Sequence, residues 1–317
     1  MSTTRSRVLA TLRDLGVPLP GGVRYDVAGK VVVITGGADG IGFALARILH
    51  AKGAVVALID VNASALDAAE SALGGKRVVT ATADVRDRAA MEAAVRGIAA
   101  DAGGIDVVVA NAGVTPPPAT LRQIDPADFD RVIDINLTGV FNTVRPAINE
   151  VIARNGHIVV VSSAAAFSPA LGGAAYVVSK AASEQLGRIL RLELAGHGAT
   201  AGVAYFGIVD TGLAKSTLDE DDLGAELNSR LPRPLRHRIT AMRAARSVAL
   251  AISRRAGSTT VPRAWQPWGL LRGLLNVLID GVLVADERSH RFIRDLEART
   301  DRRAAESTSS DSPGISD

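Results

Sequence analysis

The chain has 317 residues, with 36 Lys and Arg against 33 Asp and Glu, and its formal net charge is +3. An apolar fraction of 47% is ample for a folded core and excludes wholesale disorder. The absence of cysteine excludes disulfides, thiolate metal sites and cysteine nucleophiles and favours the inside of a cell, and we see neither a signal peptide nor a membrane-spanning run.

Short runs of β-branched and aliphatic residues alternate with alanine-rich segments from residue 31 onward. The predicted strands are Val31–Thr35, Val55–Asp60, Val78–Ala83, Val107–Asn111, Ile158–Ser162 and Val203–Phe206, with Thr259–Val261 as a seventh. The predicted helices are Ile41–Lys52, Ala63–Leu73, Ala89–Ala102, Ala127–Arg154 and Ala174–Ala195. Because the strands are apolar throughout, they indicate a parallel sheet with helices on both faces, and the repeated strand–helix units predict an α/β, doubly wound Rossmann fold.

This pattern predicts a single domain with extensions at both ends. Residues 1–28 form a polar leader with a short helix and a loop, and residues 29–262 form the Rossmann domain, with a covering segment at about 212–246. Residues 263–302 are an apolar and basic helical extension. The small polar residues at the end predict a mobile tail over residues 303–317.

A glycine-rich turn, Thr35-Gly36-Gly37-Ala38-Asp39-Gly40-Ile41-Gly42, follows the first predicted strand. Its glycines allow a tight turn and a close approach to a pyrophosphate, and the next helix offers its free N–H groups. Such a turn is weak evidence alone, but its place between a strand and a helix predicts a dinucleotide site. The residues expected to bind the dinucleotide there are Gly36, Asp39, Gly40, Ile41 and Gly42.

Asp60 ends the second predicted strand, twenty residues after Gly40. A carboxylate at this position can accept hydrogen bonds from the adenosine ribose hydroxyls and repels a 2′-phosphate, so it favours NAD over NADP. The alternative is that Asp60 is a turn or helix-capping residue. Asp84-Val85 and Asn111-Ala112-Gly113 follow the third and fourth strands, at the sheet edge where ligands bind in open parallel sheets.

With these motifs in this order, the sequence resembles the compact, single-domain branch of the short-chain dehydrogenase/reductase family. The resemblance covers about residues 29 to 211 and also rests on Asn136 in Ile135-Asn136-Leu137, on Ser163 and on Tyr176-Val177-Val178-Ser179-Lys180. It implies an NAD-dependent enzyme that acts on CH–OH groups, with Asn136, Ser163, Tyr176 and Lys180 as its catalytic residues. It also implies that Tyr176, Lys180, Gly207, Val209 and Thr211 contact the cofactor.

Tyr176 and Lys180 are four residues apart on a predicted helix and therefore share one face. A nearby ammonium would lower the pKa of the phenol from about 10 toward the range of a general acid or base. The resemblance also assigns Lys180 to the nicotinamide ribose. The alternative is an ordinary amphipathic helix with one exposed lysine and one buried tyrosine.

Ser162 and Ser163 both end a buried strand, and the resemblance selects Ser163, thirteen residues before Tyr176, for the hydrogen bond to the substrate oxygen. Asn136 lies in an apolar helix, where a buried amide must be hydrogen-bonded, and by resemblance it holds a water in a proton relay with Lys180. Phe206 replaces the proline that the family has before Gly207, and we expect its ring near the substrate. The histidines have no metal-ligand spacing, and hydride transfer to a nicotinamide needs no metal.

The C-terminal part segregates charge. Ten arginines and no acidic residue lie between residues 228 and 279, after an acidic run at 219–222. Trp265 and Trp268 precede the apolar segment 269–284, in which Arg272, Asn276 and Asp280 recur at every fourth position. Charges at 272 and 280 argue against a spanning helix. Two alternatives stay open: residues 263–285 insert into one face of a membrane, or they pack on the enzyme body or a partner subunit.

The leading hypothesis is an NAD-dependent oxidoreductase that interconverts a secondary alcohol and a ketone on a lipophilic substrate such as a steroid, a terpenoid or a long-chain compound. The alternative is a non-catalytic NAD-binding scaffold or regulatory protein of the same fold. Aromatic residues among the arginines are too few for nucleic-acid binding. We expect a cytoplasmic homo-oligomer, a dimer or a tetramer, with membrane-surface contact through 263–285 as the open alternative.

Overall fold

The structure is a computed structural model that describes residues 24–212, 226 and 235–310. The leader helix, the acidic run at 219–222 and most of the covering segment before residue 235 lie outside the described residues. The predictions for those segments therefore stay predictions.

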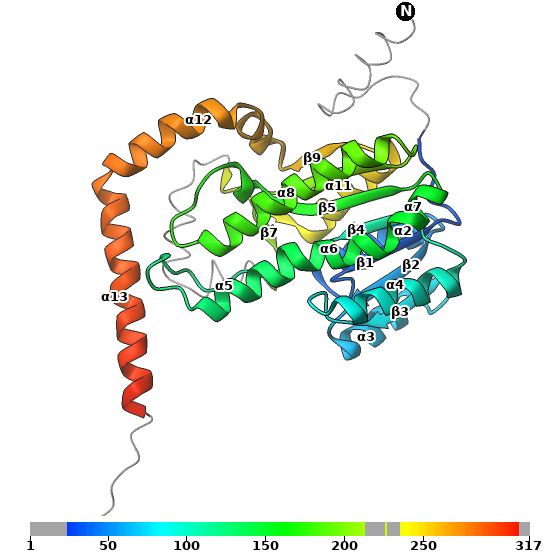
Figure 1. The fold of residues 1–317 in the computed structure, drawn as a ribbon, viewed down its shortest axis with the longest axis horizontal. Helices are drawn as coiled ribbons and strands as arrows, with labels where there is room; N and C mark the ends of the chain where they lie inside the picture. The colour runs from blue at the N-terminus through cyan, green and yellow to red at the C-terminus, as the bar shows by residue number, and fades with distance from the viewer. Residues whose placement is uncertain (1–23, 213–225, 227–234, 311–317) are drawn as a thin grey trace, which may run out of the picture.

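A seven-stranded parallel sheet forms the centre of the fold, with the strand order β3-β2-β1-β4-β5-β6-β9 (Figure 1). Every neighbouring pair is parallel, and the chain reverses its direction of winding between β1 and β4. The predicted Rossmann fold is confirmed. The strands are β1 Val31–Thr35, β2 Val55–Asp60, β3 Val78–Thr82, β4 Val107–Ala110, β5 His157–Ser163, β6 Thr200–Phe206 and β9 Ser258–Val261.

Helices cover both faces of this sheet, as continuous apolar strands require. One face packs against α2 (Gly40–Ala51), α3 (Ala63–Leu73) and α11 (Ala241–Arg254). The other packs against α4 (Arg88–Ala102), α6 (Gly139–Val144), α7 (Ile148–Ala153) and α8 (Ala174–Ala195). Residues 241–246, expected in the covering segment, instead begin α11 and bury Ala244 and Ala245 in the core, so this part of the prediction is wrong.

The predicted helix over residues 127–154 is interrupted rather than continuous. It consists of α5 (Pro126–Ile133), a π-helical turn (Asp134–Thr138), α6, a 3-10 turn (Arg145–Ala147) and α7. Pro146 lacks an N–H group and explains the second interruption. The π-helical turn contains Asn136, in keeping with the tendency of such turns to occur at functional sites.

The C-terminal extension consists of two long helices, α12 (Gln266–Ala285) and α13 (Glu287–Ser310). In Figure 1 they leave the sheet beyond β9 and bend around the side of the molecule on which α5 lies. α13 buries Phe292 and Leu296, and its Glu297 pairs with Arg122 at 2.8 Å. The backbone of α13 is helical to Ser310, past the predicted tail boundary at residue 303.

Candidate active site

The predicted functional residues meet at the carboxyl edge of the sheet, where the ends of β1, β2, β4, β5 and β6 converge. Two short strands, β7 (Val209–Asp210) and β8 (Ile239–Thr240), and a 3-10 turn (Ala164–Phe167) extend this edge. In open parallel sheets, ligands bind at this edge where the winding reverses, between β1 and β4 here. The topology thus places the glycine-rich turn next to the end of β4, with the end of β5 one strand further along the sheet.

The glycine-rich turn after β1 has a backbone that only glycine adopts readily. Gly36 and Gly40 have φ values of +61° and +56°, in the left-handed region. A Cβ on Gly42 would overlap the carbonyl oxygen of Gly36, so the first turn of α2 packs directly on the loop. This arrangement leaves a side-chain-free cradle at the N-terminus of α2, which suits an anionic pyrophosphate.

Asn111 braces this cradle from the end of β4. Its side-chain Nδ2 donates to the carbonyl oxygens of Thr35 and Gly36, at 3.0 and 3.2 Å, and its backbone N–H donates to Thr35 Oγ1 at 3.1 Å. The backbone N–H of Ala112 donates to the same hydroxyl. Asn111 therefore holds the phosphate loop against the next strand.

Asp60 lies beside the same loop. Its carboxylate accepts hydrogen bonds from the backbone N–H groups of Ala38 and Asn62, both at 3.2 Å. These bonds hold the carboxylate at the end of β2, facing the turn, where it retains acceptor capacity for ribose hydroxyls. Asp39 is exposed at the N-cap of α2 and makes no capping hydrogen bond with its side chain.

Asp84 and Val85 play different structural parts at the end of β3. Arg86 hydrogen-bonds to Asp84 through its side chain and holds the pKa of that carboxyl below its ordinary value, against the opposing effect of burial. Val85 is buried, and its carbonyl accepts from Asn142 Nδ2 at 2.9 Å. Gly139 leaves room for the Val85 side chain, since a Cβ there would lie only 2.7 Å from it.

Tyr176 and Ser163 come together from α8 and the end of β5. Burial raises the pKa of the Tyr176 phenol, and the hydrogen bond with the Ser163 side chain acts in the opposite, weaker direction. The expected lowering of the phenol pKa by Lys180 is therefore not what this structure gives, because burial dominates. Ser163 Oγ is 3.3 Å from the carbonyl oxygen of Phe206, to which it donates.

Lys180 is almost fully buried below Tyr176. Its Nζ lies 5.8 Å from the centroid of the Tyr176 ring and donates to the Val161 carbonyl at 3.2 Å. Burial lowers the pKa of this ammonium to about 8. The alternative of one exposed lysine on an amphipathic helix is thereby excluded, because Lys180 is only 4% exposed.

Asn136 is fully buried, and all its amide atoms are hydrogen-bonded. Its Oδ1 accepts from the Val114 N–H at 2.8 Å, and its Nδ2 lies 2.9 Å from the Val114 carbonyl and 3.1 Å from Ser179 Oγ. A Cβ on Gly113 would lie 3.2 Å from both Asn136 Oδ1 and Lys180 Nζ. Glycine at this position therefore leaves room for both polar groups.

The residues after β6 are divided between the site and the core. The methyl group of Thr211 would lie 3.7 Å from a Cβ on Gly40, which places Thr211 beside the phosphate loop. Gly207 lies against Trp265, and Val209 is buried with Phe206 in the core. The expectation that the Phe206 ring faces the substrate is wrong, because that side chain is only 4% exposed and packs under the sheet.

Most of the chain matches a known protein family. Residues 30–222 match the sequence profile of the family described as short chain dehydrogenase, more than half of the chain. The chain belongs to the short-chain dehydrogenase family. Among solved structures, the crystal structure of gox2181 is similar to this chain, with a TM-score of 0.70 and 25% sequence identity, and the match covers 78% of this chain and 98% of that one.

Several curated dehydrogenases are similar to this short-chain dehydrogenase. The 2,3-dihydro-2,3-dihydroxybenzoate dehydrogenase of Bacillus subtilis (strain 168) is 36% identical, over 63% of this chain and 77% of that protein. The 2-dehydro-3-deoxy-L-rhamnonate dehydrogenase (NAD(+)) of Sphingomonas sp. (strain SKA58) is also 36% identical, over 55% and 70%. The cis-4-hydroxycyclohexanecarboxylate dehydrogenase of Sinomonas cyclohexanicum is 37% identical, over 59% and 76%. This short-chain dehydrogenase is an oxidoreductase that acts on alcohol or ketone groups, and its family uses nicotinamide cofactors.

Three further serines hydrogen-bond to the predicted catalytic residues, and the sequence assigned no role to two of them. Ser179 Oγ donates to the Tyr176 carbonyl at 2.8 Å, and Ser183 Oγ lies 2.7 Å from the carbonyl oxygens of Asn136 and Ser179. Their i+3 and i+7 spacing from Tyr176 was the available signal. Ser162, expected as a structural neighbour of Ser163, donates to the Lys180 carbonyl at 2.7 Å. Among the described residues, no group of His, Asp or Glu could hold a metal ion.

Proposed function

We propose that this short-chain dehydrogenase is NAD-dependent and interconverts a secondary alcohol and a ketone, with Tyr176 as the proton-transfer residue. The observation that carries the proposal is the meeting of three side chains: Ser163 hydrogen-bonds with Tyr176, and the buried Lys180 lies beneath the Tyr176 ring. A buried ammonium is costly to the fold, and titratable groups held at such a cost beside a phenol are typical of catalytic sites.

The roles of the chain's own residues follow from this arrangement. With substrate bound, Ser163 Oγ would turn its single proton from the Phe206 carbonyl to the substrate oxygen and fix that oxygen within reach of the Tyr176 hydroxyl. Tyr176, held protonated by burial, gives its proton to the oxygen as a ketone is reduced and takes it back as an alcohol is oxidised. A bound nicotinamide supplies or accepts the hydride. Lys180 stabilises the phenolate, and Asn136 supports the relay that restores the proton.

NAD is favoured over NADP by the charges around the adenosine end of the cradle. Asp60 is held by two backbone N–H groups at the edge of the loop, and Asp39 is exposed at the N-cap of α2. Two carboxylates at this place repel a 2′-phosphate, whereas Asp60 can accept hydrogen bonds from both ribose hydroxyls. The residues that would hold NAD are those of the glycine-rich turn, Asp60, Asn111, Tyr176, Lys180 and Thr211.

The proposed substrate is lipophilic. The apolar composition of α12 supports this choice, because the turn before it packs through Trp265 on Phe167 and Tyr205, near the carboxyl ends of β5 and β6. The names of two relatives refer to a dihydroxybenzoate derivative and a hydroxycyclohexanecarboxylate, so ring alcohols belong among the candidates. The lack of cysteine supports a cytoplasmic location.

A panel of lipophilic and cyclic secondary alcohols with NAD tests this function through the formation of NADH. We expect turnover of at least one alcohol, and a loss of about 1,000-fold or more in kcat for Tyr176→Phe, because a general acid and base is removed. Tyr25→Phe is the matched control, since Tyr25 lies outside the site, where the Arg255 guanidinium is 4.6 Å from the centroid of its ring.

The outcomes separate the enzyme from the scaffold alternative. Equal turnover by Tyr176→Phe and wild type would overturn the proposed mechanism. Binding of NAD without turnover of any alcohol or ketone, together with an unchanged cellular phenotype of Tyr176→Phe, would favour a non-catalytic NAD-binding protein. Turnover confined to polar hydroxy acids would keep the reaction class and overturn the lipophilic substrate.

A further inference from the structure

Helix α12 is mounted with its polar side toward the enzyme and its apolar side toward solvent. None of its residues from Gln266 to Ala285 is buried. In a soluble protein, an amphipathic helix normally presents the opposite orientation. This orientation requires contacts that hold the polar side on the enzyme body. It also requires a partner that covers the apolar side.

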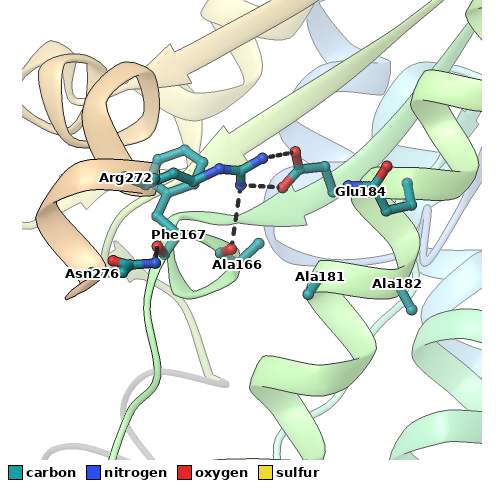
Figure 2. A pocket seen from close by; sticks show the side chains of 9 residues that line it. Ala166, Phe167, Ala181, Ala182, Glu184, Arg272 and Asn276 are labelled. Atoms are coloured by element: carbon teal, nitrogen blue, oxygen red, sulfur yellow. Dashed lines mark hydrogen bonds and ion pairs between the residues drawn. The ribbon is translucent and has the colours of Figure 1, made fainter. Parts of the chain in front are cut away.

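The polar side of α12 is held by specific bonds. Arg272 makes a bidentate ion pair with Glu184 of α8, with N–O distances of 2.6 and 2.5 Å, and Glu184 is only 4% exposed (Figure 2). Asn276 Nδ2 donates to the Phe167 carbonyl at 2.8 Å. A charge-assisted pair at a nearly buried carboxylate fixes the rotation of α12 about its own axis.

The two tryptophans at the beginning of α12 anchor it to the body. Trp265 is 7% exposed and packs with Phe167 and Tyr205, and the Trp268 ring lies 6.2 Å from that of Trp265. Trp265 thus packs on the enzyme body, which is one of the two alternatives that the sequence left open for residues 263–285. The exposed apolar side of α12 therefore consists of its aliphatic residues.

These aliphatic residues form one exposed face, which we call the outer face of α12. It consists of Leu270, Leu271, Leu274, Val277, Leu278, Val282 and Val284, each between 55% and 74% exposed. Gly273, Gly281 and Ala285 complete it, and Asp280 is the only charged residue beside it. Monomeric soluble proteins rarely expose an apolar patch of this extent unless something binds there.

α12 lies against the body rather than across a bilayer. An 18-residue window within Arg263–Ala285 has a mean hydropathy of 1.6, and by length and composition alone this segment could cross a membrane. Crossing would carry Arg272 into the hydrocarbon and leave the nearly buried Glu184 without its main partner. The ion pair therefore favours a helix that lies parallel to a lipid surface, with a length of about 30 Å.

The breadth of the outer face favours lipid over a second protein helix. Leu270, Val277 and Val284 form one row along α12, and Leu271, Leu278 and Val282 form another on the far side of Leu274. A partner helix buries one narrow seam, whereas a lipid surface accommodates the whole width. The described residues 235–279 also contain eight arginines and no acidic residue, a charge that complements anionic headgroups.

We propose that the outer face of α12 docks the enzyme on the surface of an anionic phospholipid membrane. The aliphatic side chains enter the outermost acyl region of one leaflet, and the exposed Arg263, in the turn before α12, meets the phosphate groups. The Arg272–Glu184 pair keeps the helix flat on the body while this happens. The inference does not rest on the proposed reaction.

Co-sedimentation of the full chain with vesicles tests this surface. We expect binding to vesicles of phosphatidylcholine mixed with phosphatidylglycerol, weaker binding to phosphatidylcholine alone, and weakening by salt. Leu274→Glu should lower the partition coefficient about tenfold or more, because a charge replaces a side chain that enters the lipid. Leu274 is 70% exposed, so this variant should keep the far-ultraviolet circular dichroism of wild type.

Leu121→Glu is the matched control, because Leu121 is 72% exposed in a turn of the enzyme body. It should bind vesicles as wild type does. Absence of binding by wild type to the mixed vesicles, or equal losses in the two variants, would overturn the proposal. An oligomer that Leu274→Glu dissociates, without any vesicle binding by wild type, would assign the outer face to a second copy of the chain and overturn it as well.

Discussion

The proposed preference for NAD over NADP rests on the side chain of Asp60. Its two backbone hydrogen bonds hold the carboxylate at the end of β2. The sequence offered two interpretations, a ribose ligand or a turn residue, and the structure shows that they are compatible. One carboxylate accepts from Ala38 and Asn62 and keeps lone pairs for ribose hydroxyls.

Asp60→Ala should lower the preference for NAD over NADP, measured as the ratio of the two kcat/KM values, by about 10- to 100-fold. It removes charged hydrogen-bond acceptors, each worth about 1.5–3 kcal/mol, and the repulsion of a 2′-phosphate. Asp67→Ala, at an exposed position of α3, is the control and should leave the ratio unchanged. A preference that survives Asp60→Ala would remove Asp60 from the adenosine site.

His157 makes the stability of the fold depend on pH. It is fully buried at the start of β5, and its Nδ1 lies 2.8 Å from Thr200 Oγ1. Burial, aided by Arg255 and Arg191, lowers the pKa of the imidazole from 6.5 to about 3. Between these two values the unfolded chain binds the proton and the folded chain does not, so stability falls as the pH falls.

Because of His157, we expect the free energy of unfolding to be about 2 kcal/mol lower at pH 5 than at pH 7. Urea denaturation at the two pH values measures this, and His157→Gln, which cannot take up the proton, should show a smaller loss by that amount. The comparison uses the difference between pH values, so any constant destabilisation by the glutamine cancels. Parallel pH dependences of the two proteins would contradict a neutral, buried His157.

The packing of the glycine-rich turn depends on the absence of a Cβ atom at its glycines. Gly42→Ala should weaken NAD binding and lower the melting temperature, because its Cβ would overlap the Gly36 carbonyl oxygen. Gly97→Ala on α4 is the matched control, since nothing lies within 4 Å of the Cβ it would add. That substitution should stabilise the helix by about 0.5–1 kcal/mol. Calorimetric titration with NAD measures the affinity, and thermal unfolding measures the melting temperature. A Gly42→Ala protein with the affinity and melting temperature of wild type would contradict the packing of α2 on the loop.

Most elements of the sheet could be predicted because fully buried parallel strands have an unmistakable pattern. Val31–Thr35 and Val55–Asp60 match β1 and β2, and Ala174–Ala195 matches α8. The π-helical turn at Asn136 could not be predicted, since its extra residue per turn leaves no periodic signal in five residues. The site residues followed from motif order, but the serines that position them did not.

The orientation of α12 could not be predicted from the periodicity of its sequence. Arg272, Asn276 and Asp280 form a polar stripe in the sequence, but a stripe does not say which side of a helix faces the body. That was decided by Glu184, whose nearly buried carboxylate belongs to a different element and was invisible to a local pattern. The prediction for the Phe206 ring was wrong for the same reason, because this ring packs with core residues that are distant in sequence.

At the scale of the molecule, α8 presents a second exposed apolar stripe. Val178, Ile189 and Leu192 are 51%, 52% and 76% exposed, and Phe141 on α6 is 42% exposed. We propose that this surface joins two copies into a dimer. The chain continues for more than fifty residues past Val261, the end of β9 at the edge of the sheet, and this extension favours a dimer over a tetramer.

Ile189→Glu combined with Leu192→Glu should convert this dimer to a monomer, because a buried interface tolerates unpaired charges poorly. Sedimentation velocity measures the mass, and Leu274→Glu on α12 is the control that should remain dimeric. The same helix carries Tyr176 and Lys180, so the monomer should also lose activity more than it loses secondary structure. A wild-type protein that sediments as a monomer, or a double variant that stays dimeric, would place the contact between copies elsewhere and leave the stripe on α8 to another partner.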